Sequence, residues 1–181
     1  MPRKPTATKE QIIDGAFRLI RKEGPEALTA RNLAAELGCS TQPVMYQFPN
    51  LSELKELAYQ RADQFHTEYI MSTESLLETG LRYIRFASEE THLFRFLFQS
   101  GHFDGANFLD MIRDEEPGGL LSIVAAEMKL PAKDAAPAFE ALFIAVHGYA
   151  SLIANNAIKY DPAAIENTLT SIAAGLLGED D

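Results

Sequence analysis

The sequence predicts an all-α protein of about nine helices, with a small N-terminal domain and a larger helical C-terminal domain. Almost every segment repeats its apolar residues at intervals of three or four, as one face of a helix does, and no stretch shows sustained strand alternation. Gly–Pro, Pro–Asn and Pro–Gly–Gly steps divide the helical segments. The 181 residues are 46% hydrophobic and 23% charged, which excludes a disordered chain and suffices for a buried core.

Three helices are expected in the first 50 residues. The first follows Thr8, which can cap it, and ends at Gly24, which precedes a proline. The second begins after Thr29 and ends at Gly38. The third covers about residues 41–48 and is closed by a Pro–Asn step.

Six further helices are expected beyond residue 50, with residues 71–73 as a hinge. In the helix after this hinge, Leu77, Leu81 and Ile84 are expected to share one face. Asp161 is expected to cap the last helix, with Pro162 in its first turn. The six helices are expected at about residues 52–70, 77–88, 108–113, 120–129, 132–157 and 162–177.

The second and third helices have the layout of a helix-turn-helix, because two short helices are joined by a tight turn that contains Gly38. Glycine there can adopt the positive φ that ends a helix sharply. The third helix would then expose small or planar hydrogen-bonding groups that can reach base edges or phosphates. The alternative is an ordinary helical hairpin with a polar outer face.

The order of these motifs strongly resembles the tetracycline-repressor (TetR) family. The resemblance covers Thr8 to about Leu57 and rests on the pattern LTxxxLAxELGCS, the short helix with its aromatic residue, the Pro–Asn step and the following long helix. It implies a DNA-binding domain at residues 1–50 and a ligand-binding and dimerisation domain at residues 51–181. It also implies a transcriptional regulator, most often a repressor, that a small molecule releases from DNA.

The resemblance and the exposed third helix together give the expected DNA contacts. Thr29 and Arg31 match family positions near the phosphate backbone. Two positions differ from the family pattern: Met45 stands where tyrosine is usual, and Leu51 replaces a lysine that touches phosphate. Lys55 follows one turn later, and the sequence leaves open whether it substitutes for that lysine. The residues expected to contact DNA are Thr29, Arg31, Ser40, Thr41, Gln42, Tyr46, Gln47 and Lys55.

The charge distribution agrees with a DNA-binding N-terminal domain. The chain carries a net charge of −10, which by itself argues against a polyanionic partner. Residues 1–50 nevertheless carry +2, and the remaining 131 residues carry −12. This asymmetry favours a polyanion-binding module attached to an acidic body.

The C-terminal part resembles a branch of the family with a Trp-His-Gly signature, although Val146 replaces the tryptophan ahead of His147 and Gly148. Aromatic residues and a methionine are concentrated in this part, where core packing is the default and an apolar inducer pocket is the alternative. The candidate pocket residues are Phe98, Phe103, Phe108, Met111, Phe143 and His147.

Small residues form one stripe on each of the last two helices, and such stripes let helices approach closely. Internal packing is one interpretation. The other is a homodimer joined through a four-helix bundle, because a dimer can read two half-sites of a palindromic DNA operator. The stripe residues are Ala141, Ala145, Gly148, Ser151, Ala164, Thr168, Ser171 and Gly175.

No enzyme, metal or cofactor signature is found. The four histidines show no metal-ligand spacing, and no nucleophile or phosphate-loop motif occurs. The lone Cys39 and the lack of a signal peptide or membrane-length apolar run favour a soluble, cytoplasmic protein with no membrane partner. The alternative to a regulator is a helical small-molecule-binding or interaction protein whose N-terminal domain no longer binds DNA.

Overall fold

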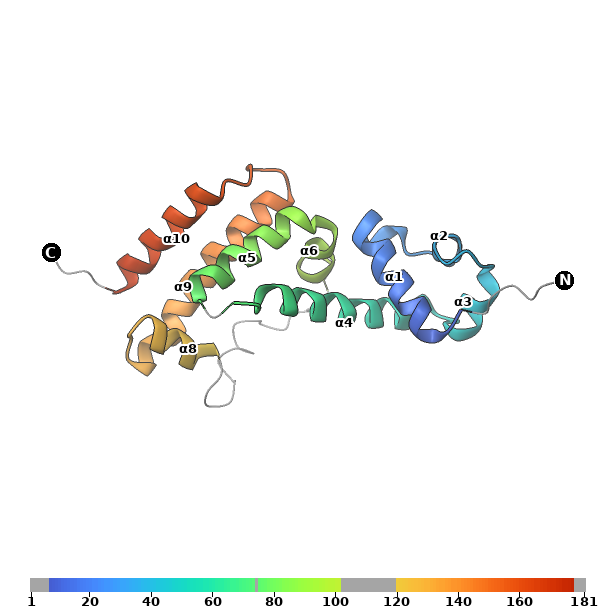
Figure 1. Cartoon of the computed structure of the whole chain (residues 1–181), viewed down its shortest axis with the longest axis horizontal. Coiled ribbons are helices and arrows are strands. Elements are labelled where there is room, and N and C mark those ends of the chain that lie inside the picture. The colour runs from blue at the N-terminus through green and yellow to red at the C-terminus, as the bar shows by residue number, and fades with distance from the viewer. Residues whose placement is uncertain (1–6, 74, 102–119, 178–181) are drawn as a thin grey trace. The chain divides into compact units, whose positions relative to one another are not determined.

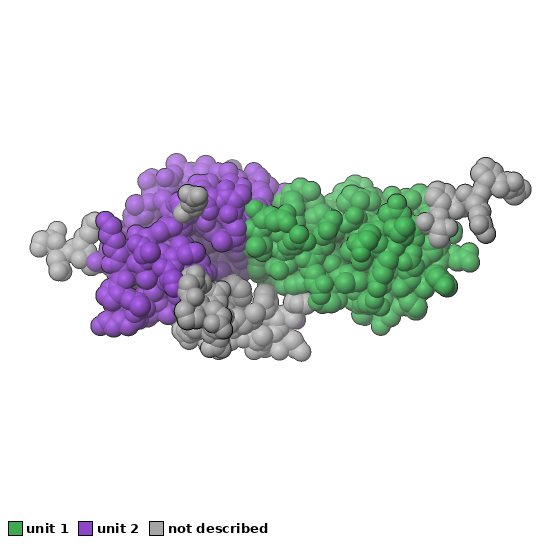
Figure 2. Space-filling view, turned by 60° about the horizontal axis from the view of Figure 1, so that its bottom comes forward, with its two compact units in different colours: residues 1–68, 90–100 green, residues 69–89, 101–181 purple. Residues whose placement is uncertain are grey.

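The computed structural model describes residues 7–73, 75–101 and 120–177, and this part of the chain is all-α, as predicted. It contains nine α-helices and a short 3₁₀ turn, with no strand among the described residues (Figure 1). The helices form two compact units, coloured separately in Figure 2. The first unit holds residues up to 68 together with 90–100, and the second holds residues 69–89 and those from 101 onward.

Helix α1 (Lys9–Glu23) begins and ends where the sequence predicts. The Thr8 hydroxyl accepts a hydrogen bond from the Gln11 backbone N–H at 3.2 Å, and the Gln11 side chain accepts one from the Thr8 N–H at 2.9 Å. This reciprocal capping box satisfies two N–H groups that the helix itself leaves unpaired. Gly24 ends the helix with φ +89°.

The other helices of the first unit pack around α1. They are α2 (Ala30–Glu36), α3 (Thr41–Gln47), α4 (Leu51–Ile70), of which the last two residues belong to the second unit, and α6 (Thr91–Phe98). The large side chains that are fully buried in this unit are Ile12, Ile20, Leu33, Phe48, Leu54, Leu93, Phe94, Phe96 and Leu97. Four of these nine come from α6, which therefore supplies much of the core.

Two polar contacts fix α6 in the first unit. The Tyr59 hydroxyl on α4 donates to the Leu97 carbonyl at 3.2 Å, and burial raises the pKa of this phenol to about 12, so it stays protonated. The Arg21 guanidinium at the end of α1 forms a paired hydrogen bond with the Glu90 carboxylate, which precedes α6. The sequence pattern did not indicate that residues 92–98 pack with the N-terminal helices.

The division into compact units therefore differs from the expected boundary at residue 50, since most of α4 and all of α6 pack with α1. The reason is that α6 packs an apolar aromatic face against α1, which precedes it by some 70 residues in the chain. The functional division at residues 50 and 51 stays a prediction.

The second unit is built on α5 (Leu76–Glu89), which packs along α9 (Ala132–Ala154), with α8 (Leu120–Glu127) and α10 (Pro162–Leu177) beside α9. The Asp161 carboxylate accepts from the Ala164 N–H at 3.1 Å, which confirms the predicted cap. The predicted helix at residues 108–113 lies outside the described residues.

The predicted face of α5 is wrong at its start, because Leu77 is 38% exposed. The side chains that α5 buries are those of Tyr83, Ile84, Phe86 and Ala87. Leu77 lies on the same side of the helix as the fully buried Ile84, seven residues later, so its exposure comes from its position in the first turn of α5, ahead of the buried stretch.

His66 on α4 is a buried titratable side chain in the first unit. It is 5% exposed, and its ring lies edge-on to the Phe98 ring, with centroids 5.1 Å apart. Burial lowers its pKa from 6.5 to about 4, because the apolar surroundings disfavour the charged imidazolium. His66 is therefore neutral in the folded protein near pH 7.

We expect His66 to make stability depend on pH. The folded-state pKa lies below the unfolded value, so the unfolded chain binds the proton more tightly and stability falls as the pH drops from 6.5 toward 4. Between pH 7 and pH 5 the free energy of unfolding should fall by about 2 kcal/mol from this group. Urea titrations at both values should show a smaller drop in His66→Gln and His66→Leu, and an unchanged drop would contradict the assignment.

Candidate nucleic-acid interface

The turn between α2 and α3 has the backbone geometry that its sequence predicts. Gly38 adopts φ +62°, the left-handed conformation that glycine reaches without a steric cost. The Gly38 and Cys39 N–H groups donate to the Ala35 and Ala34 carbonyls at 3.1 and 2.9 Å, so the end of α2 is satisfied within the turn. The chain then enters α3 directly.

The two helices are held against α1 by close packing. An added Cβ at Gly15 of α1 would lie 2.8 Å from a methyl carbon of Leu37 and 3.1 Å from one of Leu33, so a larger residue there would require these leucine side chains to shift. Leu33 and Val44 are fully buried, and they anchor α2 and α3 to the core of the first unit. The orientation of the outer face of α3 is therefore fixed by the packing of its buried side.

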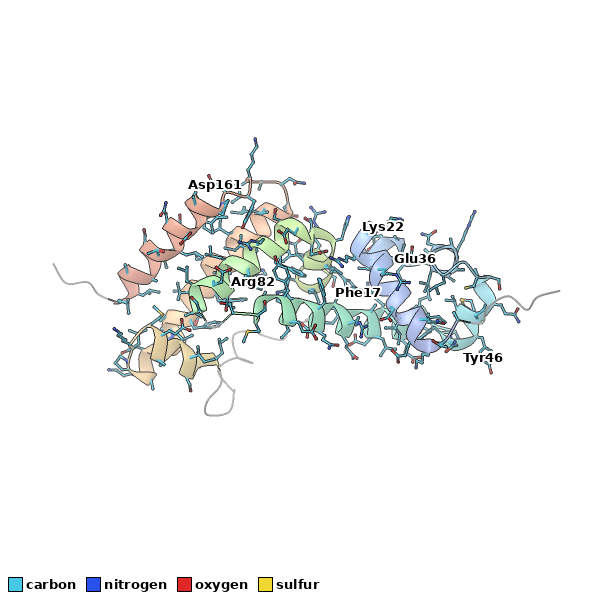
Figure 3. The ribbon with its side chains drawn as sticks, viewed as in Figure 1. Phe17, Lys22, Glu36, Tyr46, Arg82 and Asp161 are labelled. Carbon is cyan, nitrogen blue, oxygen red and sulfur yellow. The ribbon has the colours of Figure 1, made fainter. Side chains whose placement is uncertain are left out.

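The outer face of α3 is polar, exposed and uncharged. Thr41 and Gln42 are exposed, Met45 is 41% exposed and Tyr46 is 86% exposed. Figure 3 shows the Tyr46 side chain directed away from the first unit. These side chains can meet base edges or phosphates without rearranging the core.

Two predicted contact residues have other roles in the structure. The Gln47 side chain is half-buried, and its amide nitrogen donates to the Ala7 carbonyl, so it ties the start of the described chain to α3. Ser40 stands at the N-cap position of α3, but its side chain makes no capping hydrogen bond among the described residues. Its hydroxyl is exposed and available to a partner.

Most cations of the N-terminal region are used in ion pairs. Lys9 pairs with Glu53 at 3.1 Å, Arg18 with Glu36 at 3.3 Å and Arg61 with Asp14 at 2.9 Å. Arg21 and Lys22 also have acidic partners. Of the Lys and Arg side chains between residues 7 and 61, Arg31 and Lys55 are the two for which no ion pair is found within the described structure.

Arg31 and Lys55 are both exposed, on α2 and α4 respectively. Arg31 lies in the first turn of α2, whose N-cap Thr29 accepts from the Asn32 N–H at 3.1 Å. The Thr29 hydroxyl therefore has a local structural role, while the Arg31 guanidinium is free to meet an anion. The family resemblance had selected these two cations as DNA contacts. The sequence could not show that the other cations are paired, because ion pairs depend on which helices pack together.

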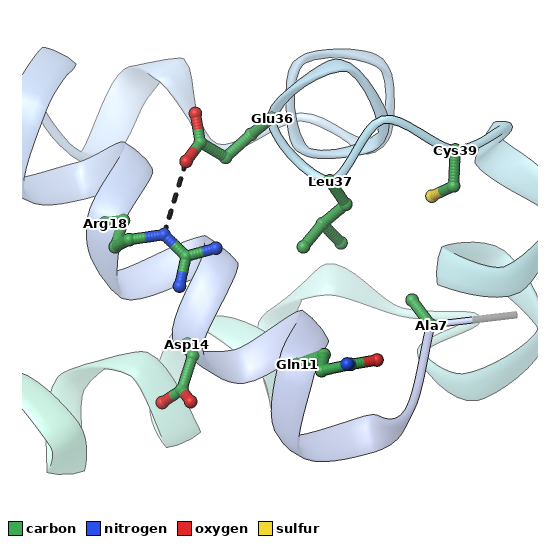
Figure 4. Close-up of a pocket in the computed structure, with 7 residues that line it drawn as sticks. All are labelled: Ala7, Gln11, Asp14, Arg18, Glu36, Leu37 and Cys39. Carbon is green, nitrogen blue, oxygen red and sulfur yellow. Dashed lines mark hydrogen bonds and ion pairs between the residues drawn. The ribbon is translucent and has the colours of Figure 1, made fainter. Parts of the chain in front are cut away.

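A cleft of about 380 Å³ lies in the first unit, between α1 and the turn that follows α2 (Figure 4). Its charged lining is already engaged, since Arg18 contacts Glu36 and Asp14 contacts Arg61. This lining is too polar for the apolar inducer pocket that the sequence predicts. The residues around the cleft are Ala7, Gln11, Asp14, Arg18, Glu36, Leu37 and Cys39.

The predicted inducer pocket can be followed only in part, because Phe103, Phe108 and Met111 lie outside the described residues. Phe98 belongs to α6 of the first unit, where it packs on His66. Phe143 and His147 lie on α9 of the second unit, with stacked rings 5.6 Å apart. Whether the six residues form one pocket stays a prediction.

Tyr83 joins the pair on α9 and was missed from the sequence. Its hydroxyl lies 2.9 Å from His147 Nδ1, and its ring lies edge-on to Phe143 at 6.2 Å. Burial lowers the pKa of His147, so its ring is neutral near pH 7 and can share the tyrosine proton. A tyrosine on the buried face of a predicted helix could have indicated a polar partner inside the unit. The partner can be identified only once α5 is known to pack on α9.

Two glycines in the stripes on α9 and α10 have open space beside them within the described chain. A Cβ added at Gly148 or at Gly175 would have no neighbouring atom within 4 Å. Thr168 differs, because its hydroxyl accepts from the Tyr149 hydroxyl at 3.1 Å within the unit. The remaining members are half-buried on α9, and Ala164 and Ser171 are exposed on α10.

Large apolar side chains accompany the small residues on α9, where Ile144 is 58% exposed and Leu152 is also exposed. By length and composition alone, α9 is the one helix in the described part of the chain that is apolar enough to cross a membrane. That is weak evidence, since core helices of soluble proteins meet the same criterion. Within the described residues, 28% of its most apolar stretch is buried, and Ile144 and Leu152 are the large apolar side chains of α9 that stay exposed.

Two short helices joined by a tight turn, with an exposed second helix on a supported core, define a helix-turn-helix protein. The chain belongs to the tetracycline-repressor-like family. Residues 76–176 match the model of its C-terminal domain, and residues 12–56 match that of the tetR family of bacterial regulatory proteins.

Over 61 residues the chain is 34% identical to the HTH-type transcriptional repressor DrrR1 of Streptomyces coeruleorubidus. The match spans 34% of this chain and 23% of that repressor. The resemblance seen in the sequence motifs is confirmed at the level of the family.

We expect Gly38→Ala to weaken the N-terminal unit through backbone strain alone. No atom would lie within 4 Å of the new Cβ, so the cost of about 1 kcal/mol comes from holding an alanine at φ +62°. Gly38→Asn should lose less, because asparagine tolerates this conformation. Urea unfolding measures both, and an alanine variant as stable as the wild type would show that the turn relaxes.

Proposed function

We propose that the protein is a sequence-specific DNA-binding transcriptional regulator. The observation that carries the proposal is the outer face of α3, where Thr41, Gln42 and Tyr46 are exposed on a helix fixed by Leu33 and Val44. In helix-turn-helix proteins this second helix enters the major groove and contacts base edges. The membership of a family of bacterial regulatory proteins supports the same function.

Arg31 and Lys55 are the phosphate-binding cations in this proposal. A protein of net charge −10 is repelled by DNA at long range, so its binding surface must present local positive charge. These two side chains are exposed and are not neutralised by an acidic partner among the described residues. Lys55 thereby takes the role of the family lysine that Leu51 replaces.

The regulator acts as a homodimer in this proposal, with the outer faces of α9 and α10 as the interface. One helix-turn-helix contacts too few base pairs for useful specificity, and a two-fold dimer reads both halves of a palindrome. The open space at Gly148 and Gly175 and the uncovered apolar side chain of Ile144 fit a second copy of this face. An isologous contact of this kind would bury the surface that one chain leaves in water.

Release from DNA is assigned to a small apolar ligand of the second unit. The candidate contact is the hydrogen-bonded pair of Tyr83 and neutral His147, with the Phe143 ring stacked on the imidazole. A few polar groups among apolar rings are what orients a ligand in an apolar pocket. A ligand that favours an arrangement of the dimer unable to bind DNA lowers the DNA affinity, at most by the ratio of its affinities for the two arrangements. We propose repression rather than activation, as for the named relative, and action in the bacterial cytoplasm without an enzymatic step.

The second candidate is a helical ligand-binding or interaction protein whose N-terminal unit has lost DNA binding. The observation in its favour is the internal pairing of Lys9, Arg18, Arg21 and Arg61, which leaves few cations for phosphates. Salt dependence separates the two candidates, because only phosphate contacts release counterions from DNA.

We expect binding to mixed genomic DNA to weaken steeply as the salt concentration rises. Arg31→Ala and Lys55→Ala should each reduce the slope of log affinity against log salt by about one per DNA-binding unit, and thus by about two per dimer. Lys159→Ala is the matched control, since Lys159 is an exposed cation of the second unit and should leave the slope unchanged. Binding that is absent at low salt would instead favour the second candidate.

We expect Gly148→Glu and Ile144→Glu to separate the dimer without unfolding the chain. Gly148 has open space around it and Ile144 is exposed, so a carboxylate is harmless in one copy but is buried unpaired in a two-copy interface. Sedimentation velocity should show a dimer for the wild type and for the control Ala126→Glu, which alters an exposed position of α8. Dimers that persist in both interface variants would place the interface elsewhere.

A further inference from the structure

The outer face of α3 has no charged side chain. The helix reads Thr41 to Gln47 without Lys, Arg, Asp or Glu, and Gln42 is its exposed amide because the Gln47 amide is held by the Ala7 carbonyl. Met45, the other large side chain beside Tyr46, is 41% exposed. The chemistry that α3 can bring into a major groove is therefore narrow.

The bases present different hydrogen-bonding and apolar groups to such a helix in the major groove. Guanine presents two acceptors, N7 and O6, and is contacted most often by Arg or Lys. Adenine presents an acceptor and a donor, N7 and N6, which match the two ends of a glutamine amide, and thymine presents a methyl group that favours an apolar contact. α3 holds the partners of adenine and thymine and lacks the cation that favours guanine.

The spacing of the two side chains supports a joint contact. Gln42 and Met45 are three residues apart, so they lie on the same side of α3, about 4.5 Å apart along its axis. Adjacent base pairs are about 3.4 Å apart. One amide and one apolar side chain can thus address the same base pair or two neighbouring ones.

We propose that the base pairs facing α3 in each half-site are A·T pairs, with the Gln42 amide bonded to adenine N7 and N6 and Met45 against a thymine methyl group. Thr41 can bond to any base and does not oppose this preference. Arg31 lies on α2, so it would contact the phosphate backbone or bases beside those that face α3. The inference rests on the proposed DNA-binding function and adds the class of sequence that it recognises.

The test is selection of bound fragments from random duplex DNA with the wild type, Gln42→Ala and Met45→Ala. The wild type should enrich a palindrome, the preference lost in Gln42→Ala should be for adenine, and the preference lost in Met45→Ala should be for thymine. Gln64→Ala and Met71→Ala are matched controls, because both side chains are exposed and neither residue belongs to the helix-turn-helix. They should enrich the wild-type sequence.

Modified bases in the selected site test the two contacts separately. Deoxyuridine in place of thymidine removes only the methyl group and should weaken wild-type binding about fourfold, as one buried methyl group would. The same replacement should leave Met45→Ala unaffected. 7-Deazaadenine, which lacks the N7 acceptor, should weaken the wild type about tenfold and Gln42→Ala hardly at all.

The outcomes distinguish this inference from the function on which it rests. G·C pairs at the positions that respond to Gln42→Ala or Met45→Ala would overturn the A·T assignment and leave the regulator intact. Enrichment that is unchanged in both variants would also overturn it. No enrichment of any sequence at low salt would overturn the DNA-binding function and the inference together.

Discussion

The close packing of α2 on α1 is the constraint on which the DNA-binding surface depends. Gly15 leaves room for the Leu33 and Leu37 side chains against α1, where a larger residue would displace them, and Gly38 turns the chain so that α3 follows at once. Buried Val44 then fixes the rotation of α3. Because interiors are close-packed, the buried side of this short helix sets its rotation, and its outer face can be polar without a cost to stability.

Most basic side chains of the first unit form ion pairs within the chain and are therefore not available to DNA phosphates. Asp14, Glu36, Glu53 and Glu90 each take a cation that a count of basic residues would have assigned to DNA. Exposed pairs of this kind add little stability one by one, yet they remove positive charge from the surface. The proposed recognition accordingly depends on two cations and on uncharged groups of α3, which suits a specific interface better than a general affinity for polyanions.

The second unit combines an interior pair and an uncovered exterior. Tyr83 and His147 share a hydrogen bond among aromatic rings, and Ile144 and Leu152 of α9 are exposed apolar side chains. These two features have different physical causes: a buried polar pair needs its partner within the chain, whereas an exposed apolar stripe is stable only when another surface covers it. The proposed ligand contact and the proposed dimer interface follow from this contrast.

The sequence by itself determined the helices of the described chain other than α6 to within a few residues, the caps at Thr8, Thr29 and Asp161, and the turn at Gly38, because these depend on neighbours three or four positions away. The family resemblance also followed from local motifs. Only the tertiary structure decided that α6 joins α1, that Gln47 bonds to Ala7, that Arg31 and Lys55 keep no acidic partner among the described residues, and that Tyr83 meets His147. Each of these contacts joins residues far apart in the chain, and no local pattern encodes which distant helices meet.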